Sequence, residues 1–337
     1  MGVSGYRLHV VELRRERALS ALDLENLDGN TAADLFMAQV SAIKGKTFVG
    51  PATYVDAEKA DSGTTSAAQE NLPRDTPILR VDEVSRVGER VEVWVSYGRA
   101  GDYDFVIHAG DGKDVPLNAG AAGRRYPVIF FGSRVGKQCV VASGVAGRTY
   151  VGTMLLSRLS VENYRLARKG SNKGDWRKWF PGVLVDEEHV REVVKRGKVE
   201  DIRLKRRGYD RAGQQKSRKL MLTQTGIRPD DRNKVVELVL GWVEAAAGKK
   251  ASSSPHSAVA ALIQLLDIDV DVSGFGFNDG ALSFHEGGKT QSIAPSNLHR
   301  ILTYTLEGDA TIEDVRKGAT GRIAAMKASL DGNFDQT

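Results

Sequence analysis

The chain has 337 residues, of which 41% are hydrophobic and 27% charged, the composition of a globular protein with room for two domains or one large one. It contains no apolar run long enough to span a membrane and no apolar secretory signal, so the sequence predicts a cytoplasmic protein without direct membrane insertion. The single cysteine, Cys139, excludes a disulfide framework and a cysteine-rich zinc site.

The first half of the chain predicts a β-rich region with one helix. Residues 57–76, which hold few large apolar side chains, and residues 111–123 are predicted loops. Asn30 precedes a predicted helix with apolar residues at helical spacing up to Ile43. Strands are predicted at residues 6–13, 47–55, 78–84, 89–97, 103–108, 127–131, 138–142 and 148–156.

The second half predicts more helix. The expected helices are residues 162–169, residues 186–196, a segment that begins at Asp230, residues 257–266 and residues 309–330. Residues 199–206 are a predicted strand, residues 208–219 an exposed basic loop, and residues 267–272 with 275–285 a hairpin.

Together these elements predict an α+β fold, a mostly antiparallel β-sheet with packed helices in a two-domain arrangement. We interpret residues 1–158 as the β-rich N-terminal region and residues 159–228 as a basic segment, a candidate for a separate DNA-contacting lobe. Residues 229–330 form a helix–hairpin–helix region that we expect to pack with the N-terminal region.

The charge is distributed unevenly along the chain. Lys and Arg outnumber Asp and Glu by only 48 to 43 overall, but residues 165–219 hold 18 basic and 8 acidic residues. The rest of the chain therefore holds 30 basic and 35 acidic residues and is slightly acidic. One basic segment on an acidic chain favours contact with a polyanion.

Residues 203–219 are the densest part of this basic segment, with eight basic residues and one acidic residue, Asp210. Clustered cations neutralise phosphates and release their counterions, which is typical of nucleic-acid binding. A solvated charged surface, or contact with an acidic partner protein, is the alternative interpretation. The candidate phosphate contacts are Arg203, Lys205, Arg206, Arg207, Arg211, Lys216, Arg218 and Lys219.

Residues 176–180 interleave aromatic and basic side chains. Such clusters can stack on bases while their cations meet phosphate, so Arg177 and Lys178 are further candidate contacts. We interpret Trp179 and Phe180 as anchors of this segment in the core. No base-reading motif is present, and the sequence therefore predicts DNA binding with little sequence preference.

Enzymatic chemistry is not predicted. Asp267, Asp269 and Asp271 alternate along a predicted strand and could collect a divalent cation, which leaves a metal-dependent nuclease as an alternative. The same alternation is typical of any half-exposed strand. Cys139 is predicted to be a core residue rather than a nucleophile. The sequence predicts no cofactor, no metal site and no catalytic residues.

Three short segments resemble a known family. GKTF at residues 45–48, GRTYVGTMLL at residues 147–156 and ILTYTLEG at residues 301–308 resemble, in their order, the Rex-type superinfection-exclusion proteins of temperate phages. The resemblance implies a prophage-encoded, DNA-binding homodimer that works with a membrane-protein partner in phage exclusion and antiviral defence. It assigns no site residue in this chain.

Overall fold

The computed structural model divides the chain into two compact units. Unit 1 contains Met1–Gly182 and Tyr304–Thr337, and unit 2 contains Val183–Thr303. The predicted α+β class, with a mostly antiparallel sheet and packed helices, is confirmed. The structure describes residues 4–15, 18–52, 73, 75–100, 105–107, 114–116, 123–146, 149–169, 176–196, 198–209, 215–225, 232–246, 260, 262–263, 279–286, 289–295, 298, 301–327 and 330–334.

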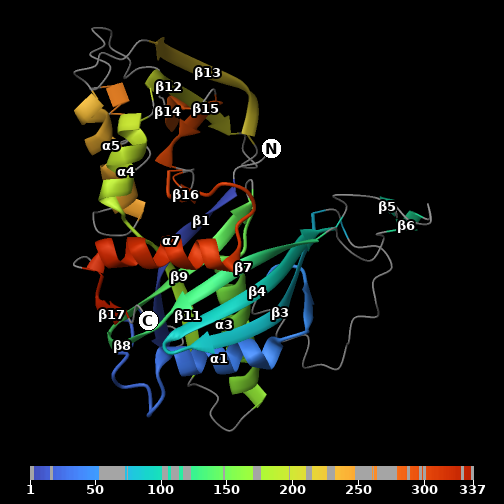
Figure 1. The fold of residues 1–337 in the computed structure, drawn as a ribbon. Helices are drawn as coiled ribbons and strands as arrows, with labels where there is room; N and C mark the ends of the chain where they lie inside the picture. Colours follow the sequence, from blue (N-terminus) through green and yellow to red (C-terminus); the bar gives the residue numbers. More distant parts are fainter. Residues whose placement is uncertain are drawn as a thin grey trace. The chain divides into compact units, whose positions relative to one another are not determined.

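One large sheet forms the body of unit 1. Its strands follow the order β11-β1-β9-β7-β4-β3-β2, with β10 beside β9 and β16 beside β1 (Figure 1). The pairings from β1 to β2 along this path are antiparallel. The strands are β1 (Ser4–Arg15), β2 (Thr47–Val49), β3 (Pro77–Val87), β4 (Arg90–Arg99), β7 (Gly123–Phe131), β9 (Gln138–Ala146), β10 (Thr149–Tyr150), β11 (Arg177–Val183) and β16 (Thr303–Thr305).

Two short strand pairs accompany this sheet. β8 (Ser133–Gly136) pairs with β17 (Gly332–Phe334), and β5 (Phe105–Ile107) pairs with β6 (Asp114–Pro116). The prediction of a loop throughout residues 111–123 is therefore wrong at β6. A three-residue segment is too short to show the alternation that predicts a strand. The strand conformation of β6 comes instead from its pairing with β5.

Helices cover both faces of the large sheet (Figure 1). α1 (Ala32–Ile43) and α3 (Gly152–Lys169) pack on one face, and α7 (Ile312–Ala325) packs on the other, against β1, β7 and β9. The central strand β7 is accordingly buried on both sides, with Ile129 and Phe130 both 0% exposed. The three valines that alternate along the strand predicted at residues 89–97, Val91, Val93 and Val95, are also 0% exposed and form its buried face.

Unit 2 is a smaller sheet packed against helices. Its strands follow the order β13-β12-β14-β15, and all three pairings are antiparallel. Ile202 and Leu204 of β12 pack with Val190 of α4 and Val239 of α5 in its core. The elements are α4 (Glu187–Arg196), β12 (Lys198–Tyr209), β13 (Gln215–Thr225), α5 (Arg232–Ala246), β14 (Asp279–Glu286) and β15 (Lys289–Ile293).

Two further predicted elements are wrong, and tertiary contacts explain both. Residues 148–156 are not one strand: β10 ends at Tyr150 and α3 begins at Gly152, because Leu155, Leu156 and Leu159 bury one helical face in the core. Residues 208–219 are not a continuous loop, because β13 begins at Gln215 and hydrogen-bonds to β12. The predicted boundary after residue 158 also falls inside α3.

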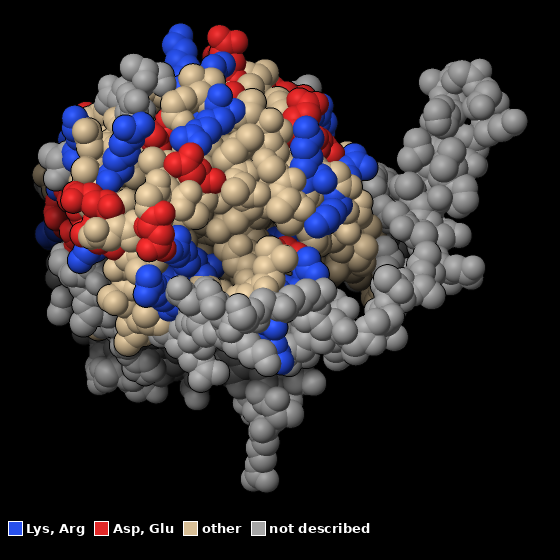
Figure 2. Space-filling model, turned by 90° about the horizontal axis from the view of Figure 1, so that it is seen from below, with Lys and Arg blue, Asp and Glu red and all other residues tan. Residues whose placement is uncertain are grey.

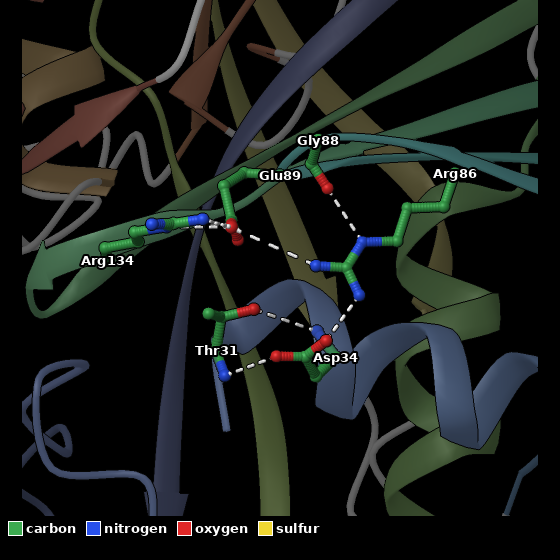
Figure 3. A network of polar contacts seen from close by, with 6 residues as sticks. All are labelled: Thr31, Asp34, Arg86, Gly88, Glu89 and Arg134. Carbon is green, nitrogen blue, oxygen red and sulfur yellow. Dashed lines mark hydrogen bonds and ion pairs between the residues drawn. The ribbon is translucent and has the colours of Figure 1, made fainter. Parts of the chain in front are cut away.

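The N-terminus of α1 is held by a polar network that also fixes the β3–β4 turn (Figure 3). Thr31, rather than Asn30, is the N-cap: its hydroxyl accepts from the Asp34 N–H at 3.1 Å, and its own N–H donates to the Asp34 carboxylate at 2.7 Å. Arg86 pairs with the other Asp34 oxygen and donates to the Gly88 carbonyl at 2.7 Å. Glu89 in the same turn pairs with Arg134 at 2.8 Å.

This network predicts a pH dependence of stability. The hydrogen bond from Arg86, followed by those from Thr31, lowers the pKa of Asp34 to about 2. A carboxyl group whose pKa is lower in the folded than in the unfolded chain stabilises the fold at pH values above its unfolded pKa, about 4. This stabilisation is lost as the pH falls toward 2. We expect the denaturation midpoint of Asp34→Asn to lie below that of the wild type at pH 6 and to approach it near pH 2. If the difference between the two denaturation midpoints stayed constant from pH 6 to pH 2, the low pKa of Asp34 would not contribute to stability.

Candidate nucleic-acid interface

The hairpin of β12 and β13 carries most of the predicted contacts. We call residues 203–219 the basic ribbon. β14 pairs with β12 only from Lys198 to Lys205. Beyond that point Arg206 and Arg207 pair with Leu220 and Lys219 of β13, so that this end of the sheet is two-stranded in the described part of the chain.

The register places one pair of like charges at opposed positions of the ribbon. Arg207 lies directly opposite Lys219, a like-charge cross-strand pair that is unfavourable in isolation. Arg203, Lys205 and Arg207 occupy alternate positions of β12 and so belong to one face of the sheet. For the stability of the free protein alone, opposite charges at these two opposed positions would be more favourable than like charges. The arrangement is one that a bound polyanion would stabilise.

The structure places most of the remaining ribbon candidates in strands, but not Arg211. The strand pairing is irregular between Arg207 and Tyr209, and bulges of this kind increase the local twist of a ribbon. Lys216, Arg218 and Lys219 belong to β13 rather than to the predicted loop. Arg211 lies outside the described residues.

Among the side chains that the structure describes, two of the predicted cations have carboxylate partners. The Arg203 guanidinium is 2.7 Å from the Asp201 carboxylate on the same strand, and Arg177 pairs with Asp28. Asp201 is largely buried, so this partner is held in place beside Arg203. These ion pairs offset the positive charge of both arginines. The structure therefore weakens the case for phosphate contact at Arg203 and Arg177.

The aromatic and basic cluster lies in β11, which is in unit 1, whereas the ribbon is in unit 2. Arg177 and Lys178 are each partly buried. Trp179 is 3% exposed, and its indole N–H donates to the Gln39 side chain at 2.6 Å, which confirms its prediction as a core anchor. The same prediction is wrong for Phe180, whose side chain is 43% exposed. The guanidinium carbon of Arg14 lies over the Phe180 ring, 3.8 Å from the ring centroid.

One face of the molecule mixes both signs of charge among its described residues. Figure 2 shows Lys and Arg interspersed with Asp and Glu across the face that it presents. Among the residues that the structure describes, no group of three or more His, Cys, Asp or Glu side chains could hold a metal ion. Asp267, Asp269 and Asp271 lie outside the described residues, so the metal hypothesis stays untested at that segment.

Cys139 is a buried core residue, as predicted. It is 1% exposed in β9, and burial raises the pKa of its thiol to about 12. Because the thiolate is the reactive form, we expect a thiol reagent at pH 8 to leave the native protein unmodified and to label one thiol in urea. Stoichiometric labelling of the folded protein on the mixing timescale would contradict this placement.

Comparison with known proteins gives no relative: no family model, no curated protein and no solved structure matches the chain. Within the described residues, no helix has both the length and the apolar character that a membrane span requires.

Proposed function

We propose that this protein binds duplex DNA with little sequence preference and that the basic ribbon is its principal contact. The observation that carries the proposal is a two-stranded β-ribbon with like-charged residues at opposed positions, Arg207 and Lys219. A two-stranded ribbon has the dimensions to enter the major groove of B-form DNA. Its cations would meet the phosphates on either side, and these contacts supply affinity without reading the sequence.

The salt dependence of affinity tests this proposal. If about six ribbon cations each neutralise one phosphate, log Kd should change with log salt concentration with a slope of magnitude roughly 5. Fluorescence anisotropy on the full chain, with labelled duplex DNA, single-stranded DNA and RNA of equal length, gives the slope and the preferred nucleic acid. Absence of binding to all three at low salt would overturn the proposal, and tighter binding to RNA would replace duplex DNA as the ligand.

Two alternative functions predict different outcomes. A metal-dependent nuclease would degrade plasmid or RNA in the presence of Mg²⁺ or Mn²⁺, and EDTA would stop the reaction. A module for an acidic partner protein would retain that partner after nuclease treatment and would not bind free DNA. We favour the non-enzymatic DNA-binding function because the ribbon has the shape as well as the charge for a groove.

The biological role that we propose is phage exclusion, and its support is the resemblance to Rex-type proteins. That resemblance also implies a homodimer and a membrane-protein partner. Cells that express the wild-type protein should reduce the plating efficiency of a superinfecting phage, and cells that express a DNA-binding-deficient ribbon variant should not.

Light scattering at micromolar concentration should give twice the monomer mass, and a monomer mass would contradict the dimer.

A further inference from the structure

Unit 1 contains a pocket of about 430 Å³ that the DNA-binding proposal does not use. It lies between residues 50–52, the neighbouring ends of β3 and β4, and the first two turns of α3. This volume is within the range of small-molecule sites, roughly 300–1,000 Å³. The pocket is therefore large enough for a metabolite and too small for a folded partner.

One wall of the pocket is polar and comes from α3. Thr153, Ser157 and Arg158 line it, and their spacing places them on one side of the helix. Arg158 is only 9% exposed, and its guanidinium donates to the Gly50 carbonyl oxygen at 3.0 Å. The same guanidinium carbon lies 4.7 Å from the centroid of the Phe48 ring. The cation is thus fixed in position at the pocket wall.

The facing strand adds a second arginine. Arg99 of β4 donates to the Tyr97 hydroxyl at 3.1 Å and lies 3.9 Å from the carboxylate of Asp75. Asp75 is 77% exposed at its side chain, so water screens this ion pair. The charged side chains among the described lining residues are two arginines, Arg99 and Arg158, and one carboxylate, Asp75.

The rest of the described lining is largely apolar. Leu79 and Tyr97 line the pocket from adjacent strands and are 7% and 5% exposed, and Met154 lines it from α3. A site with an apolar wall and a few convergent polar groups suits a ligand with a charged head and an apolar body. The hydroxyls of Thr153 and Ser157 would donate to the same anionic head as the arginines.

We propose that this pocket binds a small organic anion. Its phosphate or carboxylate head would meet Arg99 and Arg158, and its apolar body would lie against Leu79, Tyr97 and Met154. Arginine recognises both head groups through paired N–H donors, which is why the structure defines the charge and size of the ligand rather than one head group. The proposal is independent of DNA binding, because the ribbon belongs to unit 2.

Isothermal calorimetry on the full chain tests this proposal. The probes are inorganic phosphate, the four nucleoside monophosphates and a set of aromatic carboxylates, so that the phosphate and carboxylate heads are compared directly. We expect saturable 1:1 binding of at least one organic anion, tighter than that of inorganic phosphate. Arg99→Ala should weaken this binding about tenfold or more, because it removes a charge-assisted contact.

Arg80→Ala is the matched control. Arg80 is also a half-exposed arginine paired with an aspartate, Asp82, but it is not among the residues that line the pocket. Thr153→Glu is a second variant, which places a carboxylate in the pocket and should abolish binding. The proposal is overturned if the wild type binds no probe at millimolar concentration, or if Arg80→Ala loses as much affinity as Arg99→Ala.

Discussion

Reversal of Arg206, Arg207, Arg218 and Lys219 to glutamate should abolish DNA binding at physiological salt. The ribbon changes from eight basic residues and one acidic residue to four basic and five acidic, and its net charge changes from +7 to −1. If the ribbon binds DNA as proposed, each lost cation would remove one phosphate contact, and each new carboxylate would be repelled by the DNA backbone. We expect affinity to fall by about three orders of magnitude or more, and the salt slope to fall by about 4. Gel shift and anisotropy would measure both changes.

A second charge-reversal variant distinguishes the effect of the ribbon from the effect of the total charge of the chain. Lys44, Lys46, Lys317 and Lys327 are all exposed in unit 1, so their change to glutamate alters the total charge by the same amount. We expect this control variant to keep most of its affinity. Equal loss in both variants would mean that the attraction is a property of the whole chain, and unchanged affinity in the ribbon variant would remove the ribbon from the interface. Circular dichroism confirms that each variant folds.

The second large effect is expected on stability. Trp179 packs edge-on against Phe36 and Phe130, whose rings stack at 4.3 Å between centroids. Trp179→Ala removes these contacts and leaves Gln39 without its donor, and we expect a loss of about 3–5 kcal/mol in the free energy of unfolding. The neighbouring Phe180 is half-exposed, so Phe180→Ala should cost about 1 kcal/mol or less.

Urea denaturation of both variants measures this contrast between adjacent residues. If Trp179 instead contributed mainly to stacking on nucleic acid, Trp179→Ala would lower DNA affinity and leave the denaturation midpoint unchanged. A similar loss of stability in Phe180→Ala would contradict the exposed position of its ring. The comparison therefore tests the division of this cluster into a core residue and a surface residue.

Regular patterns made part of the fold predictable. The alternation of valines at residues 91–95 required a strand with one buried face, and the charge order of residues 186–196 matched a helix. α4 and β4 lie there in the structure. The apolar spacing of the last predicted helix favours four core positions, of which Val315, Ile323 and Met326 are buried and Ile312 is only partly buried. Each of these elements is specified by its own side chains.

Other features depended on contacts that a local pattern does not contain. β13 combines charged residues with a short apolar segment, and its strand conformation comes from pairing with β12. The pocket in unit 1 was not predicted, because residues 50–52, 75–79, 97–99 and 153–158 meet only in the folded chain. Arg158 in particular is one of 48 basic residues, and only its burial at the pocket wall sets it apart.

Unit 1 is discontinuous in the chain, and this has a consequence for its synthesis. Its sheet receives α7 and β16 from the C-terminal segment Tyr304–Thr337, while all of unit 2 is translated in between. Tyr6 of β1 lies beside Gly318 of α7, so this contact joins two residues that lie on opposite sides of unit 2 in the sequence. We therefore expect a ribosome stalled before residue 304 to carry a nascent chain with one uncovered sheet face, which is a substrate for chaperones.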